Sequence, residues 1–162
     1  MDQGTASSHT VVVEKDVSMS TRDGVTLYAD VYRPGADDSF SVLLARTPYD
    51  KSGDMALTKK DYFPQHGYVV VVQDTRGRFR SEGEFYPFIS EARDGYDSIE
   101  WAAGLPWSDG NVGTVGQSYL GLVQYLAAQE RPPHLRATSP VSISATHFEN
   151  TAYMRGVFEL GW

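Results

Sequence analysis

The sequence predicts an α/β protein whose sheet is mostly parallel and carries an antiparallel hairpin at one edge. Two apolar runs without alternation, residues 41–46 and 68–73, are typical of strands that are covered on both faces. Residues 11–19 and 25–32 are rich in β-branched and aromatic side chains and flank a turn that ends at Gly24, which indicates a hairpin. Strand-like and helix-like segments then alternate along the rest of the chain, as expected for a parallel sheet.

Helices are expected between these strands. Residues 55–66 are predicted to form a helix that ends at Gly67, with Pro64 in its last turn. Residues 91–103 carry apolar side chains at helical spacing, and Gly104 follows as a stop signal. Both segments are long enough to cross from one strand to the next.

The second half of the chain continues the same alternation. Residues 111–115 are short and apolar, as in a buried strand, and residues 122–128 are good helix formers. A break at Pro132 and Pro133 precedes a further predicted strand at residues 135–141.

Composition narrows the class of protein. The chain has 162 residues, of which 41% are hydrophobic, and this is enough for one domain with its own core. A formal net charge of -7, with acids and bases interspersed, indicates neither nucleic-acid nor membrane binding. The chain has no cysteine, which excludes disulfides, thiolate metal sites and a cysteine nucleophile. With a polar N-terminus and no long apolar run, the expected location is cytoplasmic.

The most informative motif is Gly-Gln-Ser-Tyr-Leu-Gly at residues 116–121. It places Ser118 between small residues where a strand should turn sharply into a helix, the setting of a nucleophilic serine. The usual pattern has glycine two residues after the serine, whereas here that position is Leu120 and the glycine is Gly121. The alternative interpretation is a glycine-rich turn whose serine caps the following helix.

Several linked motifs give this chain a family resemblance. They lie at residues 22–25, 30–34, 46–51, 73–77, 81–85 and 107–113, and the last leads into residues 116–119. In order and spacing these segments resemble the N-terminal part of the α/β-hydrolase domain of the cocaine esterase and X-prolyl dipeptidyl aminopeptidase family, the CocE/NonD type. The family also includes α-amino acid ester hydrolases. Its serine motif has tyrosine after the serine and glycine one position late, as in this chain.

The resemblance implies an α/β-hydrolase fold, here its incomplete N-terminal portion, and a serine hydrolase site. Ser118 would be the nucleophile, and the backbone N–H of Tyr119 would be one donor of the oxyanion hole. The hydroxyl of Tyr49 would be the second donor, from a loop after strand 41–46, where the ligand-facing loops of parallel sheets lie. The alternative for Tyr49 is a packed aromatic ring with a hydrogen-bonded hydroxyl. No cofactor and no metal are expected.

The rest of a catalytic triad is not evident. No aspartate follows Ser118, so an order of serine, Glu130 and His147 is formally available. Glu130 is expected at the far end of the helix after the serine, and His134 in the return loop at the opposite edge. In the family the histidine comes from a much later strand. The triad acid and histidine are therefore expected outside this chain.

Four other conspicuous residues are interpreted as structural. Asp74 and Arg76 follow a buried strand and are expected to fix the adjoining loop through a partly buried ion pair or backbone hydrogen bonds. Trp101 and Trp107 are expected to lie in the core or to cover the turn around Ser118.

The expected organisation has three parts. Residues 1–11 form a disordered N-terminus, residues 12–141 the N-terminal part of the hydrolase domain, and residues 142–162 the truncated start of a helical cap. The predicted function is that of a serine hydrolase that cleaves small acyl esters or amides through an acyl-enzyme. Esterase, acylase and X-Pro dipeptidyl-peptidase types stay open. The alternative is a catalytically inactive remnant that acts as a structural or interaction module, and self-association of the truncated chain is expected.

Overall fold

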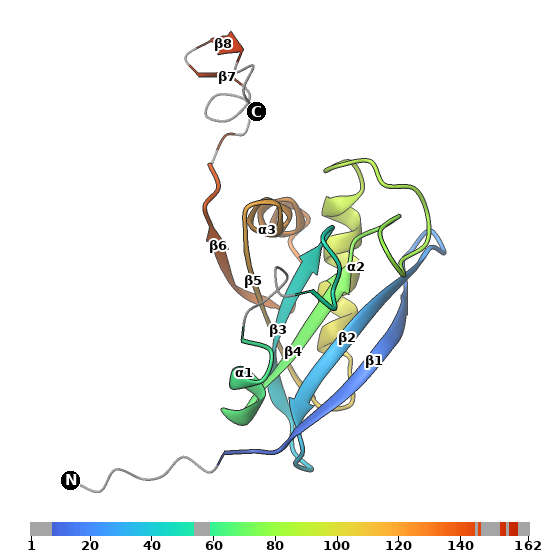
Figure 1. Ribbon diagram of the computed structural model, residues 1–162, viewed down its shortest axis with the longest axis vertical. Helices are drawn as coiled ribbons and strands as arrows, with labels where there is room; N and C mark the ends of the chain where they lie inside the picture. The colour runs from blue at the N-terminus through green and yellow to red at the C-terminus, as the bar shows by residue number, and fades with distance from the viewer. Residues whose placement is uncertain (1–7, 54–58, 145, 147–152, 155, 159–162) are drawn as a thin grey trace, which may run out of the picture.

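A six-stranded mixed sheet forms the body of the molecule, as shown by a computed structural model that describes residues 8–53, 59–144, 146, 153–154 and 156–158. The strands are β1 (Val11–Ser20), β2 (Thr26–Pro34), β3 (Phe40–Thr47), β4 (Tyr68–Asp74), β5 (Ser108–Gln117) and β6 (Leu135–Val141). The helices are α1 (Tyr62–Gln65), α2 (Glu91–Ala103) and α3 (Tyr119–Gln129). The strand order across the sheet is β1-β2-β4-β3-β5-β6 (Figure 1).

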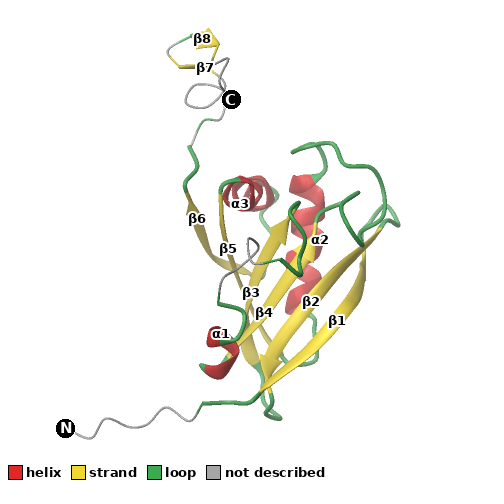
Figure 2. Cartoon of the chain, in the orientation of Figure 1, coloured by secondary structure: helices red, strands yellow, loops and turns green. Residues whose placement is uncertain are grey.

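Strand directions confirm the predicted hairpin and parallel core. β1 is antiparallel to β2, and β2 is antiparallel to β4. β4, β3, β5 and β6 are mutually parallel, with helices in the connections (Figure 2). The turn between β1 and β2 contains Gly24 at φ 85°, the positive value that the sequence indicated.

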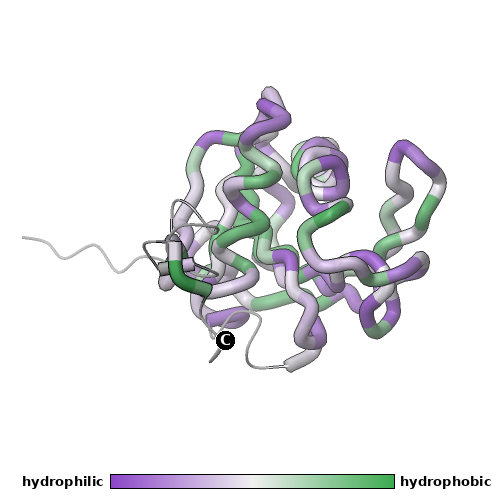
Figure 3. Tube along the Cα trace, turned by 90° about the horizontal axis from the view of Figure 1, so that it is seen from above, coloured by the Kyte–Doolittle hydropathy of each residue, from purple (hydrophilic) through white to green (hydrophobic). Residues whose placement is uncertain are grey.

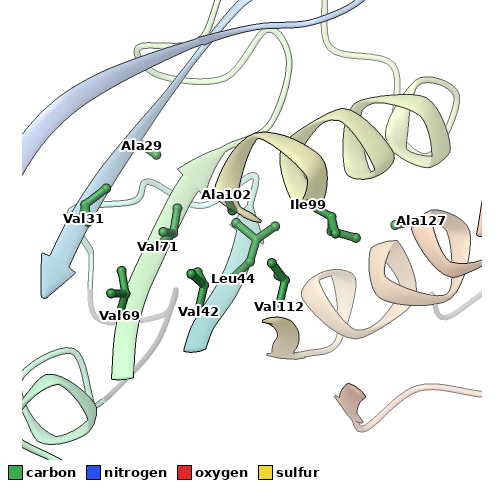
Figure 4. Packing of buried hydrophobic residues seen from close by; sticks show 10 residues of the cluster. All are labelled: Ala29, Val31, Val42, Leu44, Val69, Val71, Ile99, Ala102, Val112 and Ala127. Carbon is green, nitrogen blue, oxygen red and sulfur yellow. The ribbon is translucent and has the colours of Figure 1, made fainter. Parts of the chain in front are cut away.

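Helices cover both faces of the sheet. Side chains of a strand alternate between its faces, so neighbouring valines of β4 belong to different clusters. Val71 packs in the main cluster with Ile99 of α2 and Ala127 of α3 (Figure 4). Val70 points the other way, into a cluster against which Phe63 of α1 packs. Figure 3 shows that turns at the periphery are mostly hydrophilic, as expected around a buried sheet.

The helix expected at residues 55–66 is not continuous, because residues 59–61 form a turn. Only Tyr62–Gln65 are helical among the described residues of this segment, and residues 54–58 lie outside the described chain. Pro64 lacks the N–H for a helical bond to Lys60, and its ring would clash with that carbonyl, so a long helix with Pro64 in its last turn is unfavourable. Gly67 ends the segment at φ 82°, as predicted.

Much of the two terminal parts of the predicted organisation, residues 1–11 and 142–162, falls outside the described residues. Residues 1–7 are not described, but residue 9 already contacts the fold, because the His9 N–H donates to the carbonyl of Gln65 at 3.2 Å. Of residues 142–162, the described part includes two short antiparallel strands, β7 (Tyr153–Met154) and β8 (Val157–Phe158). The helical cap therefore stays a prediction.

β6 is an edge strand, and we expect it to cause self-association of the 162-residue chain. In the described part of the molecule β6 pairs only with β5, and its residues 136–139 are exposed. Unpaired edges are templates for pairing with other chains. Light scattering after size exclusion should show a molar mass that rises with concentration, and Ala137→Lys should reduce this rise. A monomer at all concentrations would contradict the expectation.

Candidate active site

Ser118 occupies the sharp turn that the sequence predicted. β5 ends at Gln117 and α3 begins at Tyr119, so Ser118 is the only residue between strand and helix. Its φ of 57° and ψ of -122° lie in a region that non-glycine residues rarely adopt, and such strain is found mainly at functional sites. Ser118 is exposed on the surface.

Backbone hydrogen bonds hold this strained conformation. The N–H of Ser118 donates to the carbonyl of Val141 in β6 at 2.9 Å. The carbonyl of Ser118 accepts from the N–H groups of Gly121 and Leu122 at 2.8 and 3.0 Å, which begins the helix. The serine is therefore fixed from both sides by main-chain contacts that leave its side chain uninvolved.

Two glycines allow the strand and the helix to approach each other. A Cβ atom at Gly121 would lie 2.6 Å from Cγ2 of Ile143, and one at Gly116 would overlap Cβ of Leu120. Leu120, where the usual pattern has glycine, is instead 2% exposed and packs into the cluster behind the turn. Glycine is therefore needed at position 121, one residue later than in the usual pattern, because Ile143 lies against it.

We expect Gly116→Ala to destabilise the fold by roughly 2 kcal/mol or more, because overpacking is added to backbone strain. Gly116 has φ 151°, and the added methyl group would overlap Leu120. Gly24→Ala is the matched control, since Gly24 also has a positive φ, 85°, but no atom within 4 Å of the added Cβ. Urea unfolding of both variants measures the difference. Equal losses of unfolding free energy in the two variants would mean that the close approach of Gly116 to Leu120 does not add to the cost of the substitution.

The helix-cap interpretation of Ser118 is wrong. Ser118 is at the N-cap position of α3, but its side chain makes no capping hydrogen bond. A capping serine has its backbone in the β region and its hydroxyl on an amide of the first turn. Here the backbone conformation of Ser118 turns the hydroxyl away from that role.

Tyr119 is the best-anchored residue of the site. As the first residue of α3, its N–H is one of the amides that a helix cannot satisfy itself. Its ring is 9% exposed and stacks on Phe88 at a centroid distance of 4.7 Å. Its hydroxyl donates to Oε1 of Glu91 at 2.8 Å. Burial, and then the negative charge of Glu91, raise the pKa of this hydroxyl far above its usual range, so it remains a proton donor.

Tyr49 lies beside Tyr119, on the loop after β3. The two rings meet edge to face at 6.4 Å between centroids, and the side chain of Tyr49 is 42% exposed. The Tyr49 ring is packed against Tyr119, so the alternative of a packed aromatic ring stays open beside the role in the oxyanion hole. The structure thus brings Tyr49 to the side of the serine turn; its role as an oxyanion donor stays a prediction.

Basic side chains hold the loop that carries Tyr49. Nε of Arg78 donates to the carbonyl of Pro48 at 3.0 Å, and Nζ of Lys60 donates to the carbonyl of Gly53 at 2.8 Å. Lys51 is only 3% exposed despite its charge. An exposed tyrosine is therefore presented by a loop whose main chain is tied down on both sides.

Lys51 explains the predicted structural role of Asp74. Oδ1 of Asp74 accepts the Lys51 N–H at 2.8 Å, and Nζ of Lys51 lies 3.4 Å from Oδ2 of Asp74 and 2.8 Å from Oδ1 of Asp16. Burial acts to lower the pKa of the Lys51 ammonium, but the hydrogen bond to Asp16 and the charges of Asp74 and Asp30 outweigh it and raise that pKa. Arg76 likewise pairs with Asp94, with Nη2 and Oδ1 2.6 Å apart. Both residues are structural, as predicted.

The two tryptophans are partly buried and pack against the core, which is one of the two places predicted for them. Trp101 and Trp107 pack against the main cluster with Val112, at the ends of α2 and the start of β5. Trp107 precedes β5 and Ser118 follows it, so strand length separates them. Phe85 and Phe88 cover the serine turn instead.

The candidate triad partners in the described chain lie elsewhere. Glu130 is the C-cap of α3, at the opposite end of the helix from Ser118. Nδ1 of His134 lies 2.7 Å from Oε2 of Glu100, before β6, as the sequence placed it. His147 is outside the described residues.

The described residues were also compared with what a metal site or a membrane span requires. Within them, no group of three potential metal ligands lies together, and no helix is long and apolar enough to span a membrane.

An exposed, strained serine between a strand and a helix of a mixed α/β sheet is the arrangement of α/β-hydrolases. The family model for the X-Pro dipeptidyl-peptidase (S15 family) matches residues 23–161. The chain therefore belongs to the X-Pro dipeptidyl-peptidase family S15, a family of serine hydrolases.

Sequence and structural similarity to individual proteins agrees with this family assignment. The chain is 43% identical over 148 residues to the cocaine esterase of Rhodococcus sp., covering 89% of this chain and 26% of that protein. A CocE/NonD family hydrolase from Staphylococcus aureus superposes with a TM-score of 0.75 at 33% identity, over 79% of this chain and 27% of that one. An α-amino acid ester hydrolase gives a TM-score of 0.75 at 27% identity, over 99% and 30% respectively. The chain spans about a quarter of the length of the curated relatives it matches, at 26%.

Sequence reasoning missed Glu91 and Arg46 at the site. Nη1 of Arg46 lies 2.7 Å from Oε2 of Glu91, and both side chains are almost fully buried. In the sequence, Arg46 ends an apolar strand and begins the motif at residues 46–51, and Glu91 stands at the start of a predicted helix. Neither signal indicates that they meet beneath Tyr119.

Proposed function

We propose that this chain carries the nucleophile and the oxyanion hole of a serine hydrolase that cleaves small acyl esters or amides through an acyl-enzyme. The observation that carries the proposal is the exposed Ser118 in its strained turn, with the Tyr119 amide and the Tyr49 ring beside it. Membership of the S15 family supports the same chemistry.

In this mechanism the Ser118 hydroxyl attacks the carbonyl carbon of the substrate. The carbonyl oxygen becomes an oxyanion, which accepts hydrogen bonds from the Tyr119 N–H and the Tyr49 hydroxyl. Collapse of the tetrahedral intermediate releases the alcohol or amine and leaves an acyl-Ser118 ester, which water then hydrolyses. The Tyr119 amide suits this role because the start of a helix favours negative charge.

A general base must accept the Ser118 proton and later return it to the leaving group. We place the triad histidine and acid outside this chain. Two observations support this: His134 is paired with Glu100 away from the site, and the relatives are about four times as long as the matched segment, which covers 26% of the cocaine esterase.

The substrate class is proposed only as small acyl esters or amides. One relative is named for cocaine, an ester, and another for α-amino acid esters, while the family is named for X-Pro dipeptides, which are amides. The chemistry common to all three is transfer of an acyl group from an ester oxygen or an amide nitrogen to a nucleophile, which we assign to Ser118 in this chain.

A hybrid protein tests the nucleophile. In this hybrid, the present chain replaces the matched segment of the Rhodococcus cocaine esterase, which supplies the remaining three quarters of the molecule. Intact mass after treatment with a fluorophosphonate should show a single adduct, which Ser118→Ala abolishes and Ser139→Ala retains. Labelling that survives Ser118→Ala would remove Ser118 from the mechanism.

The inactive-module alternative applies to the 162-residue chain by itself, and it predicts a distinct result. Without a general base beside Ser118, we expect this chain to hydrolyse p-nitrophenyl acetate no faster than its own Ser118→Ala variant. A spectrophotometric assay of both at equal concentration measures this. If the chain turns over the ester and His147→Ala abolishes that activity, a triad within the chain becomes the better interpretation.

A further inference from the structure

The side chain of Tyr119 connects the two proposed oxyanion donors. Its own backbone N–H is one donor, and its ring contacts the ring of the other, Tyr49, edge to face at 6.4 Å. Phe88 stacks on the same ring at 4.7 Å and limits its movement on another side. Any rotation of the Tyr119 ring would therefore disturb both its own turn and the position of Tyr49.

Glu91 fixes this ring through the hydroxyl at its end. The hydroxyl donates to Oε1 of Glu91 at 2.8 Å, in a place where both residues are buried. Hydrogen bonds to a charged acceptor are among the stronger ones, and burial strengthens them further.

Glu91 is itself held rigidly. Its Oε2 atom pairs with Nη1 of Arg46 at 2.7 Å, and Nη1 also donates to the Glu91 carbonyl at 3.2 Å. Nε of Arg46 donates to the buried amide oxygen of Gln73 at 3.0 Å. Glu91 is the first residue of α2, where the helix dipole favours its negative charge. The acceptor for Tyr119 is thus anchored to α2, β3 and β4 together.

We propose that Glu91 is a positioning residue for the oxyanion hole, acting through its hydrogen bond to the Tyr119 hydroxyl. This hydrogen bond fixes the position of the first residue of α3, and therefore the direction of the Tyr119 N–H. It also keeps the Tyr119 ring in contact with the ring of Tyr49. This inference rests on the proposed function, because it concerns donors that matter only if Ser118 forms an acyl-enzyme.

Tyr119→Phe in the hybrid tests the inference, since it removes the hydroxyl and retains the ring and the backbone N–H. We expect kcat for p-nitrophenyl acetate to fall about 10- to 100-fold, because small misplacements at a reacting centre have effects of this size. KM should change little, and inhibition by a boronic acid, which mimics the tetrahedral state, should weaken in parallel. Tyr125→Phe on the same helix, 37% exposed, is the matched control and should leave both unchanged.

A second variant separates positioning from general stability. Glu91→Gln removes the charged acceptor, and if the two residues act as one unit its effect on kcat should not add to that of Tyr119→Phe in the double variant. Additive losses, or an unchanged kcat in Tyr119→Phe, would overturn the inference while Ser118-dependent labelling still stands. Loss of Ser118-dependent labelling would overturn both proposals together.

Discussion

Replacing Ser118 by alanine in the hybrid is expected to reduce hydrolysis of p-nitrophenyl acetate to the limit of detection. Loss of a serine nucleophile lowers kcat by up to about a millionfold, and only the contribution of binding and of the oxyanion donors remains. The fold should persist, because Ser118 is held by its backbone N–H and carbonyl, with Val141, Gly121 and Leu122 as partners. Its side chain is exposed and does not cap the helix.

Two measurements are needed for this result. Steady-state turnover gives the loss of activity, and urea unfolding of the same variant should give an unchanged midpoint. Ser139→Ala is the control, an exposed serine on β6 whose backbone, and not its hydroxyl, bonds Gln124. Substantial turnover in Ser118→Ala, with Ser139→Ala equal to the parent, would assign the chemistry to another nucleophile.

The serine turn could be predicted from sequence because everything it needs is local. Gly116 and Gly121 are spaced so that a strand and a helix can meet closely, and this requirement appears in six consecutive residues. The parallel core could also be predicted from the sequence, since strands buried on both faces must be apolar throughout. The contact of Gly121 with Ile143 could not be read from the motif, because it depends on where β6 leads the chain.

The supporting network could not be predicted because its contacts join distant segments. The Tyr119 hydroxyl meets Glu91 across 28 residues, and Lys51 meets Asp74 across 23. No periodic pattern records such pairs, and a buried glutamate looks in sequence like any surface acid. Asp74 was recognised as structural from its place after a buried strand, but its partner was not.

One local feature was also misjudged, for a physical reason that the sequence contained. Pro64 was placed in the last turn of a long helix, where it would have had to follow several helical residues. Its ring and missing N–H are favoured in the first turn of a helix, and among the described residues 59–66 only Tyr62–Gln65 are helical.

Replacing Tyr49 by phenylalanine in the hybrid should lower kcat about a hundredfold or more while KM changes little. If the Tyr49 hydroxyl donates to the developing oxyanion, its loss removes an interaction made mainly in the transition state, worth about 3 to 4 kcal/mol for one such donor. The ring should stay in place, because its edge contact with Tyr119 does not involve the hydroxyl. Stability should therefore be unchanged.

Tyr68→Phe is a closely matched control for this substitution. Tyr68 is 41% exposed, compared with 42% for Tyr49, and its ring also meets an aromatic neighbour, Phe63, edge to face at 6.3 Å. It stands at the start of β4, however, and parallel strands place their ligand-facing loops at the other end. Steady-state kinetics should show full activity for Tyr68→Phe and a loss confined to kcat for Tyr49→Phe. A rise in KM with kcat intact would instead assign the Tyr49 hydroxyl to ground-state binding, leaving the Tyr119 amide as the donor to the oxyanion.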